Sequence, residues 1–436
     1  MPQVEQKDQP AVTDNPYANS GPRYYALGIL TLVYTFNFID RQLLAILQEG
    51  IKADLGLSDG QLGLLTGLAF AIFYVVAGVP IARWADHANR RNIISLAVFI
   101  WSFMTALSGA AQNYLQLLLA RIGVGIGEAG GSPPAHSMIS DMFPVSSRAW
   151  ALGIFTTGIN AGILFGFLFG GWLNEYFGWR AAFVAVGVPG ILVALLVRYQ
   201  LKEPIRGLME ARAVSEERSS FRAVVSLLWS RNSFRHMAFA CGLIAFAAYA
   251  ILNWTASFMV RTHGMSTGEL GSWLAMIFGV GGALGILVCS RLADKLGAND
   301  KRWYVWISAA TALLSIPLVL GVYSVNSGQL ALLLLVIPGS LLTVFVPLSV
   351  AMIHGLVGLR MRATGSAILY LVLNIIGLGG GPWCVGMLSD YLAPTLGVQS
   401  LGAAMLYLIP AALGWSALHF LLAGRRLREE LAQAPD

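Results

Sequence analysis

The chain alternates between long apolar runs and short polar segments. About 20 consecutive apolar residues are enough to cross a bilayer as a helix, and the 436 residues contain twelve such runs. In the first half they cover 24–47, 61–82, 92–111, 114–139, 149–173 and 180–200, and in the second half 236–260, 269–290, 303–325, 329–353, 363–388 and 400–423. The pattern predicts an all-α membrane protein with twelve transmembrane helices.

The polar segments divide the chain into a tail (1–23), a six-helix bundle (24–200), a charged linker (201–235), a second bundle (236–423) and a tail (424–436). The two bundles resemble each other in sequence. A shift of 208 places 55–63 on 263–271, and a shift of 214 places Pro133, Arg148 and Asn160 on Pro347, Arg362 and Asn374. Parallel repeats of this kind are related by an axis along the membrane normal, with a site between them.

The charge distribution supports the membrane assignment. Hydrophobic types make up 56% of the residues and charged types 11%, against roughly 25% charged residues in soluble domains. Twenty-two of the 28 Lys and Arg residues lie in the two tails and the even-numbered loops. By the positive-inside rule both termini are cytoplasmic. The net charge of +6 therefore reflects orientation signals, and we expect no nucleic-acid partner.

Four charged residues lie deep inside apolar runs of the first bundle. They are Asp40 and Arg41 in the first run and Arg121 and Glu128 in the fourth. A charge at mid-bilayer costs roughly 2.5–3.5 kcal/mol on insertion scales, so these side chains must face the bundle interior. Arg121 and Glu128 are seven residues apart and share a helix face, whereas Asp40 and Arg41 point about 100° apart. The second bundle has no charged residue away from its helix ends.

Two interpretations of these charges remain open. In one, they form a static network that fixes helix packing. In the other, Asp40 and Glu128 take up and release a proton as Arg41 and Arg121 approach and withdraw, because burial raises a carboxylate pKa and a nearby Arg lowers it. Buried acids in transporter helices often form proton relays. We favour proton coupling by Asp40 and Glu128.

Other polar residues of the runs are weaker candidates for the lining of a central cavity, since packing explains most of them as well. They are Asn37, Ser132, His136, Tyr249, Asn253, Trp254, Tyr370 and Asn374. Glycines at four-residue spacing predict close helix packing, with one stripe at Gly123, Gly127 and Gly131 and another at Gly158, Gly162, Gly166 and Gly170. The segment 377–383, GLGGGPW, predicts a bent or loosened helix.

The equivalent loops 82–91 (ARWADHANRR) and 290–302 (SRLADKLGANDKR) resemble the cytoplasmic loop signature of the major facilitator superfamily. The resemblance implies a cytoplasmic gate, for which the candidate residues are Asp86, Arg90, Arg91, Asp294 and Lys295. Asp86 and Asp294 would cap neighbouring helix N-termini and latch the outward-open state. Alternatively, they are solvated charges that only set topology.

A closer resemblance is carried by FNFIDRQLLAIL (36–47) and ARIGVGIGEAGGSPPAHSMISDMFP (120–144). These stretches are similar to the spinster family of the same superfamily, although organic-anion/proton symporters also carry an Asp-Arg pair in the first helix. The spinster resemblance implies proton-linked movement of lysophospholipid- or sphingoid-like amphiphiles by alternating access. Arg41 and Arg121 would hold the anionic head, and the charge-free second bundle would accommodate the acyl chain. The alternative is a small organic-anion/proton symporter.

The sequence lacks the motifs of other functional classes. It contains no phosphate-binding GxxxxGK[ST] loop, no HExxH and no Cys/His cluster. We therefore expect a transporter and not an enzyme, with no cofactor and no metal. The expected partners are membrane lipids, protons and a small amphiphilic or anionic substrate, with the protein a monomer. Its compact loops favour a multi-pass protein of the bacterial inner (plasma) membrane.

Overall fold

A computed structural model describes residues 16–17, 19–207, 209, 221–358 and 361–434. Most of the predicted N-terminal tail and the middle of the predicted linker therefore lie outside the described residues. The first half consists of α1 (Ser20–Leu55), α2 (Asp59–Gly63), the π-helical segment η2 (Leu64–Leu68), α3 (Ala69–His87), α4 (Arg90–Ser108), α5 (Tyr114–Glu128), α6 (Ser132–Met142) and α7 (Val145–Gln200).

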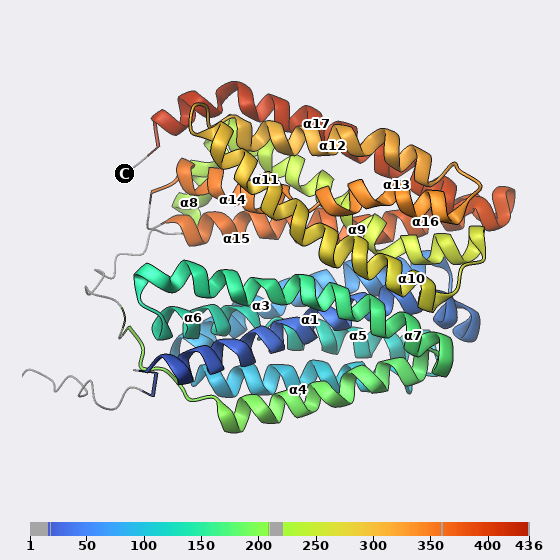
Figure 1. Ribbon diagram of the computed structural model, residues 1–436, viewed down its shortest axis with the longest axis horizontal. Coiled ribbons are helices and arrows are strands. Elements are labelled where there is room, and N and C mark those ends of the chain that lie inside the picture. Colours follow the sequence, from blue (N-terminus) through green and yellow to red (C-terminus); the bar gives the residue numbers. More distant parts are fainter. Residues whose placement is uncertain (1–15, 18, 208, 210–220, 359–360, 435–436) are drawn as a thin grey trace, which may run out of the picture.

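The linker contributes α8 (Phe221–Ser230), and the second half follows it. Its elements are α9 (Asn232–His263), α10 (Thr267–Leu274), the π-helical η3 (Ala275–Gly281), α11 (Gly282–Gly297), α12 (Trp303–Val322), α13 (Gly328–Leu341), α14 (Phe345–Leu356), α15 (Arg362–Val372), the π-helical η5 (Leu373–Gly380), α16 (Gly381–Leu396), the 3-10 turn η6 (Gly397–Gln399) and α17 (Ser400–Ala432). Figure 1 shows the halves as two bundles of long helices lying alongside each other.

Each of the twelve predicted spans has a helical counterpart. Nine continuous helical segments of the described residues are long and apolar enough to cross a membrane. The segment 145–200 holds two spans, because Gly178 breaks it with a φ of 78° that favours glycine. The segment 364–432 also holds two, divided at Gly397, and the remaining span is α5 with α6, which are too short to count singly.

Several helices extend past the predicted boundaries. The helix α1 continues to Leu55, and α17 continues to Ala432 through most of the segment predicted as a tail. Polar residues at these ends stop the apolar count, but they do not stop the helix. The predicted loosening of 377–383 is confirmed in position, because η5 runs over 373–380 and Pro382 occupies the first turn of α16.

The repeat is also visible in the helix starts. Ser58 caps α2 by accepting from the Gln61 N–H, and Ser266 caps α10 by accepting from the Glu269 N–H. These two caps are 208 residues apart, which is the shift found in the sequence. In both halves the capped helix then passes through a π-helical segment, η2 or η3. The halves are therefore built on the same local plan.

The halves meet at one end of the molecule. We call the helix ends near Ser20 and Ala432 the terminal end, and those near Leu55 and Ser400 the distal end. At the distal end, α2 packs against α16 and α7 packs against α10. The hydrogen bonds between the halves cluster there, for example from Ser257 to Gln48 at 3.1 Å. The described structure is thus closed at the distal end.

Candidate functional site

The four buried charges meet in one place and pair crosswise. An Nη1 of Arg121 lies 2.9 Å from Asp40 Oδ2, and the Nε of Arg41 lies 2.7 Å from Glu128 Oε2. Asp40 and Arg41 are neighbours on α1, and Arg121 and Glu128 lie two turns apart on α5. Because adjacent residues of a helix point in different directions, each member of the α1 pair meets a different member of the α5 pair. The predicted interior position of all four is confirmed.

The carboxylates of the two ion pairs differ in how completely they are hydrogen-bonded. Both oxygens of Asp40 are engaged, since Thr105 on α4 donates to Oδ1 at 2.5 Å and Arg121 donates to Oδ2. The Glu128 Oε1 atom is buried and has no hydrogen-bond partner among the described residues. Arg41 is also the most accessible of the four, with 15% of its side chain exposed, against 3% for Arg121.

Aromatic rings surround the guanidinium of Arg41. The rings of Phe38 and Phe70 each lie 4.9 Å from it, and that of Tyr74 lies at 5.2 Å. Phe70 also lies 5.9 Å from the Arg121 guanidinium, so one ring touches both cations. Such contacts stabilise a desolvated cation. Sequence reasoning did not single out these rings, or Thr105, because aromatic and Thr residues occur throughout the apolar runs.

The local sequence explains why Glu128 ends a helix. Gly130, Gly131 and two prolines follow it, and α6 starts at Ser132 with those prolines in its first turn. The carboxylate therefore lies at the negative end of the α5 dipole. The predicted packing of the glycine stripe is confirmed, because Gly127 has no room for a Cβ atom beside Trp101 of α4. The other glycine stripe packs on α1 in the same way.

The weaker candidates of the first half lie on α1 and α6. Asn37 is buried one turn before Asp40, and its Oδ1 has no hydrogen-bond partner among the described residues. His136 is exposed on α6, with its Nδ1 2.8 Å from the Ser132 carbonyl oxygen and its ring edge-on to Phe155. These contacts fit a helix histidine with one satisfied ring nitrogen, and a cavity role for His136 stays a prediction.

The candidate cavity residues of the second half differ in how exposed they are. Tyr249 on α9 is half-buried and lies within electrostatic range of Arg41. Tyr370 on α15 is 45% exposed, and Asn374 in η5 is half-buried. Asn253 is buried and donates to the Tyr249 carbonyl oxygen of its own helix at 2.8 Å.

The proposal that Trp254 lines a cavity is wrong in this conformation. Its side chain is completely buried, and its indole N–H donates to the Pro382 carbonyl oxygen at 2.8 Å. The ring therefore packs α9 against α16 inside the second half. A hydropathy pattern alone cannot separate a ring in a cavity wall from a ring in the core.

The loop residues occupy unequal environments. Asp86 and Lys295 are exposed, and Asp294 accepts from the Tyr304 hydroxyl at 2.6 Å. The N-cap of α4 is Asn89, so this helix does not use Asp86 as its cap here. The outward-open latch stays a prediction.

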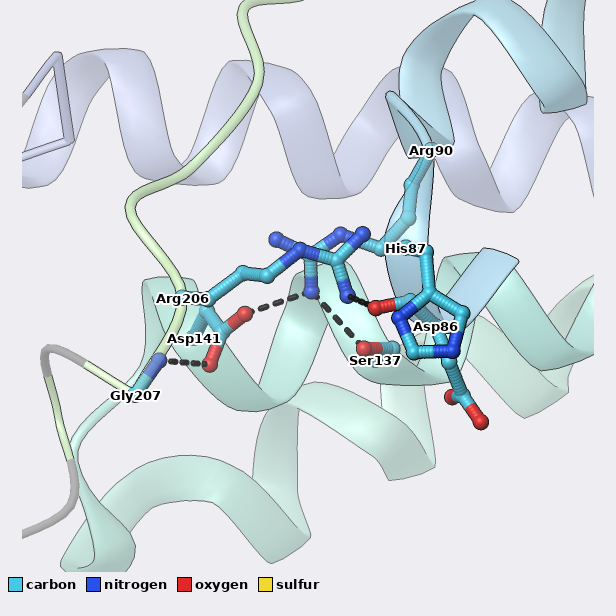
Figure 2. A pocket seen from close by; sticks show the side chains of 7 residues that line it. All are labelled: Asp86, His87, Arg90, Ser137, Asp141, Arg206 and Gly207. Atoms are coloured by element: carbon cyan, nitrogen blue, oxygen red, sulfur yellow. Dashed lines mark hydrogen bonds and ion pairs between the residues drawn. The ribbon is translucent and has the colours of Figure 1, made fainter. Parts of the chain in front are cut away.

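Arg90 connects several elements of the first half, and its part in a cytoplasmic gate stays a prediction. It is buried in the first half and bonds Asp141 at 2.5 Å and Glu203 of the linker at 2.7 Å. The backbone N–H of Arg91 also donates to Glu203. Arg206 donates to three carbonyl oxygens at the end of α3. Figure 2 shows Arg90, Asp141 and Arg206 lining a polar pocket. These contacts fasten the linker to the first half.

Sequence reasoning missed an ion network at the distal end. Arg261 of α9 bonds Glu49 of α1 and Asp59 of α2, each at 2.7 Å. Asp59 is also held by Lys52 at 2.5 Å and by Ser389 of α16 at 2.6 Å. Lys52 and Arg261 both lie between predicted spans in the sequence. Few basic residues lie in the odd-numbered loops. Their rarity there was the available sign that those present have specific partners.

The comparisons with known proteins agree with this architecture. The family model of the Major Facilitator Superfamily matches residues 30–382. An MFS-type efflux pump of Mycolicibacterium smegmatis is 35% identical over 97% of this chain and 98% of its own length. The chain therefore belongs to the major facilitator superfamily and is a multi-pass membrane protein of a transporter family.

Within the superfamily the chain is spinster-like. A crystal structure of a bacterial homolog of the human lysosomal transporter Spinster, inward-facing and unoccupied, superposes with a TM-score of 0.82 at 31% identity. The alignment covers 95% of this chain and 98% of that one. A cis,cis-muconate transport protein of Acinetobacter baylyi is 26% identical over 84% of this chain and 85% of its own length.

Proposed function

We propose that this protein is a proton-coupled secondary transporter that moves amphiphiles with an anionic head, of the lysophospholipid or sphingoid type, by alternating access. It works in the bacterial inner membrane as a monomer, with both termini cytoplasmic. The observation that carries the proposal is the unequal pair of ion pairs. In one pair both carboxylate oxygens of Asp40 are hydrogen-bonded. The other pair combines an accessible guanidinium with a carboxylate that has an unpartnered oxygen.

The asymmetry assigns separate tasks to the two carboxylates. Asp40 uses both oxygens to hold Arg121 and Thr105, so it is the fixed member. Glu128 uses one oxygen to hold Arg41 and has Oε1 left to accept a proton. Both stay candidates for proton coupling, and Glu128 is the one that exchanges the proton with the least rearrangement.

The substrate and the proton compete through Arg41. An anionic head that binds its guanidinium draws Arg41 away from Glu128. Glu128 is then a buried carboxylate without a counter-ion, which is costly until it binds a proton. Loading one anion and one proton together leaves the charge of the site unchanged. The expected mode is therefore symport, and Arg121 stays paired with Asp40 as a second positive charge near the head.

The second half suits an apolar chain. Its spans carry no charged residue away from their ends. Tyr249 offers aromatic surface near the head site, and Tyr370 of α15 is 45% exposed. A small organic anion is the second candidate substrate, which the similarity to the muconate transport protein favours. Such an anion would need polar partners in the second half, where Asn253 and Asn374 are available.

Transport into liposomes with an imposed pH gradient tests the proposal. Purified protein is reconstituted and offered lysophosphatidylglycerol or cis,cis-muconate in parallel. Gradient-driven accumulation of the lysolipid, lost in Arg41→Gln and retained in the control Asp54→Asn, supports the main proposal. Accumulation of muconate alone supports the second candidate. Accumulation that ignores the pH gradient for both probes contradicts proton coupling.

A further inference from the structure

At the distal end, an acidic side chain of the second half caps a helix of the first half. Asp390 on α16 accepts from the Asp59 N–H at 2.9 Å with one oxygen and from the Gly60 N–H at 2.8 Å with the other. These amides belong to the first turn of the helical segment 59–87, where N–H groups lack partners within the helix. A carboxylate there is favoured by hydrogen bonding and by the helix dipole.

The reciprocal contact exists on the other side of the interface. Glu175 on α7, in the first half, accepts from the Gly268 N–H at 2.9 Å with Oε2. Gly268 lies in the first turn of the helical segment 267–297 in the second half. Each half therefore supplies one carboxylate that caps a helix of the opposite half.

The two contacts occupy equivalent positions of the repeat. Gly60 and Gly268 are 208 residues apart, and Asp390 follows Glu175 by 215, close to the second repeat shift of 214. Glycines make the close approach possible in both places. A Cβ atom on Gly386 would lie 2.3 Å from the Asp59 carbonyl oxygen, and one on Gly171 would lie 2.3 Å from that of Thr267. The resemblance is structural as well as sequential.

These caps exist only while the distal end is closed. Ser58 and Ser266 cap their helices from within the same half, and those bonds survive any movement of one half against the other. The bonds from Asp390 and Glu175 cross the interface and break when the halves separate at this end. They therefore stabilise the closed state relative to the open one.

We infer that Asp390 and Glu175 form a pair of cross-half helix caps that hold the distal end closed and set its opening equilibrium. The substrate and the proton act elsewhere, at the buried ion pairs, so the inference does not depend on which substrate is carried. Asp390 makes two amide bonds and stands beside the Arg261 network. Glu175 is exposed, so its replacement should be tolerated by the fold.

The rate of alkylation at a buried interface residue measures opening. Ser257 is 1% exposed and bonds Gln48 across the halves, so Ser257→Cys, with the native cysteines replaced by alanine, reacts with a maleimide mainly when the distal end opens. We expect Glu175→Ala and Asp390→Ala to raise this rate about fivefold each, and about 25-fold together, as typical for losing a helix cap. Glu175→Gln, which keeps one acceptor, should give a smaller increase.

Two controls separate opening from general loosening. A second background keeps Cys241 as its single cysteine. Cys241 is completely buried within the second half, with its thiol against Ser349, and its alkylation should not change when the cap substitutions are made in this background. Asp54 pairs with Arg180 inside the first half, so Asp54→Ala should leave both rates unchanged. An unaltered rate at position 257 in the double variant would overturn the inference, as would an equal increase at Cys241.

Discussion

Replacing the two buried carboxylates by amides should affect stability very differently. In Asp40→Asn, the Arg121 guanidinium stays charged, with 3% of its side chain exposed, and loses its only ion-pair partner among the described residues. Removing one member of a buried ion pair costs about 3–5 kcal/mol, because the other charge is left unpaired. Thr105 also loses a charged acceptor.

In Glu128→Gln, the partner Arg41 loses its counter-ion in a less buried position. Arg41 is 15% exposed, can turn toward the cavity and keeps its contacts with Phe38, Phe70 and Tyr74. We therefore expect a loss below about 2 kcal/mol, in the range of one charged hydrogen bond. Glu128→Gln should nevertheless abolish proton coupling, because an amide cannot take up the proton.

Unfolding in mixed micelles with increasing SDS, followed by circular dichroism, gives the free energy of unfolding for each variant. Asp54→Asn is a matched control, since the Asp54–Arg180 pair is exposed and surface pairs contribute about 0–1 kcal/mol. Equal losses for the two buried variants, or a larger loss for Glu128→Gln, would refute the assignment of Asp40 as the fixed member.

Three further substitutions test particular contacts. Trp254→Phe leaves the Pro382 carbonyl oxygen without its donor and should cost about 1–3 kcal/mol in SDS unfolding without altering substrate preference. Gly386→Ala places a methyl group 2.3 Å from the Asp59 carbonyl oxygen, and should raise the alkylation rate at position 257 as the cap variants do. Phe70→Leu removes the ring beneath both guanidiniums, and should lower the free energy of unfolding by about 1–3 kcal/mol, whereas an unchanged value would show that the ring is only a spacer.

The sequence predicted the helices and the location of the charged residues well, because both depend on local information. Helix geometry alone shows that a run of about 20 apolar residues can cross a bilayer. It also shows that Arg121 and Glu128, seven residues apart, share one helix face. The crosswise pairing could not be predicted, since it depends on how α1 and α5 rotate against each other. The predicted cavity position of Trp254 was wrong for the same reason, because the burial of its ring depends on where Pro382 lies in a distant helix.

The cross-half caps at the distal end could not be predicted from the sequence for a further reason. Asp390 and Glu175 look like ordinary loop-side acids, and their meaning comes from backbone N–H groups of the opposite half. Every residue except proline carries such a group, so the sequence contains no signal for this partner. Only the repeat hinted that similar contacts would occur twice.

Glu128 is proposed to take up a proton when the substrate displaces Arg41, and transport by Glu128→Gln in proteoliposomes examines this step. Two assays are run on the same preparation with the substrate that the wild-type protein carries, namely exchange at equal pH and accumulation driven by a pH gradient. We expect exchange to continue in Glu128→Gln and gradient-driven accumulation to be lost. Accumulation that persists at the wild-type level in Glu128→Gln would contradict the proposal.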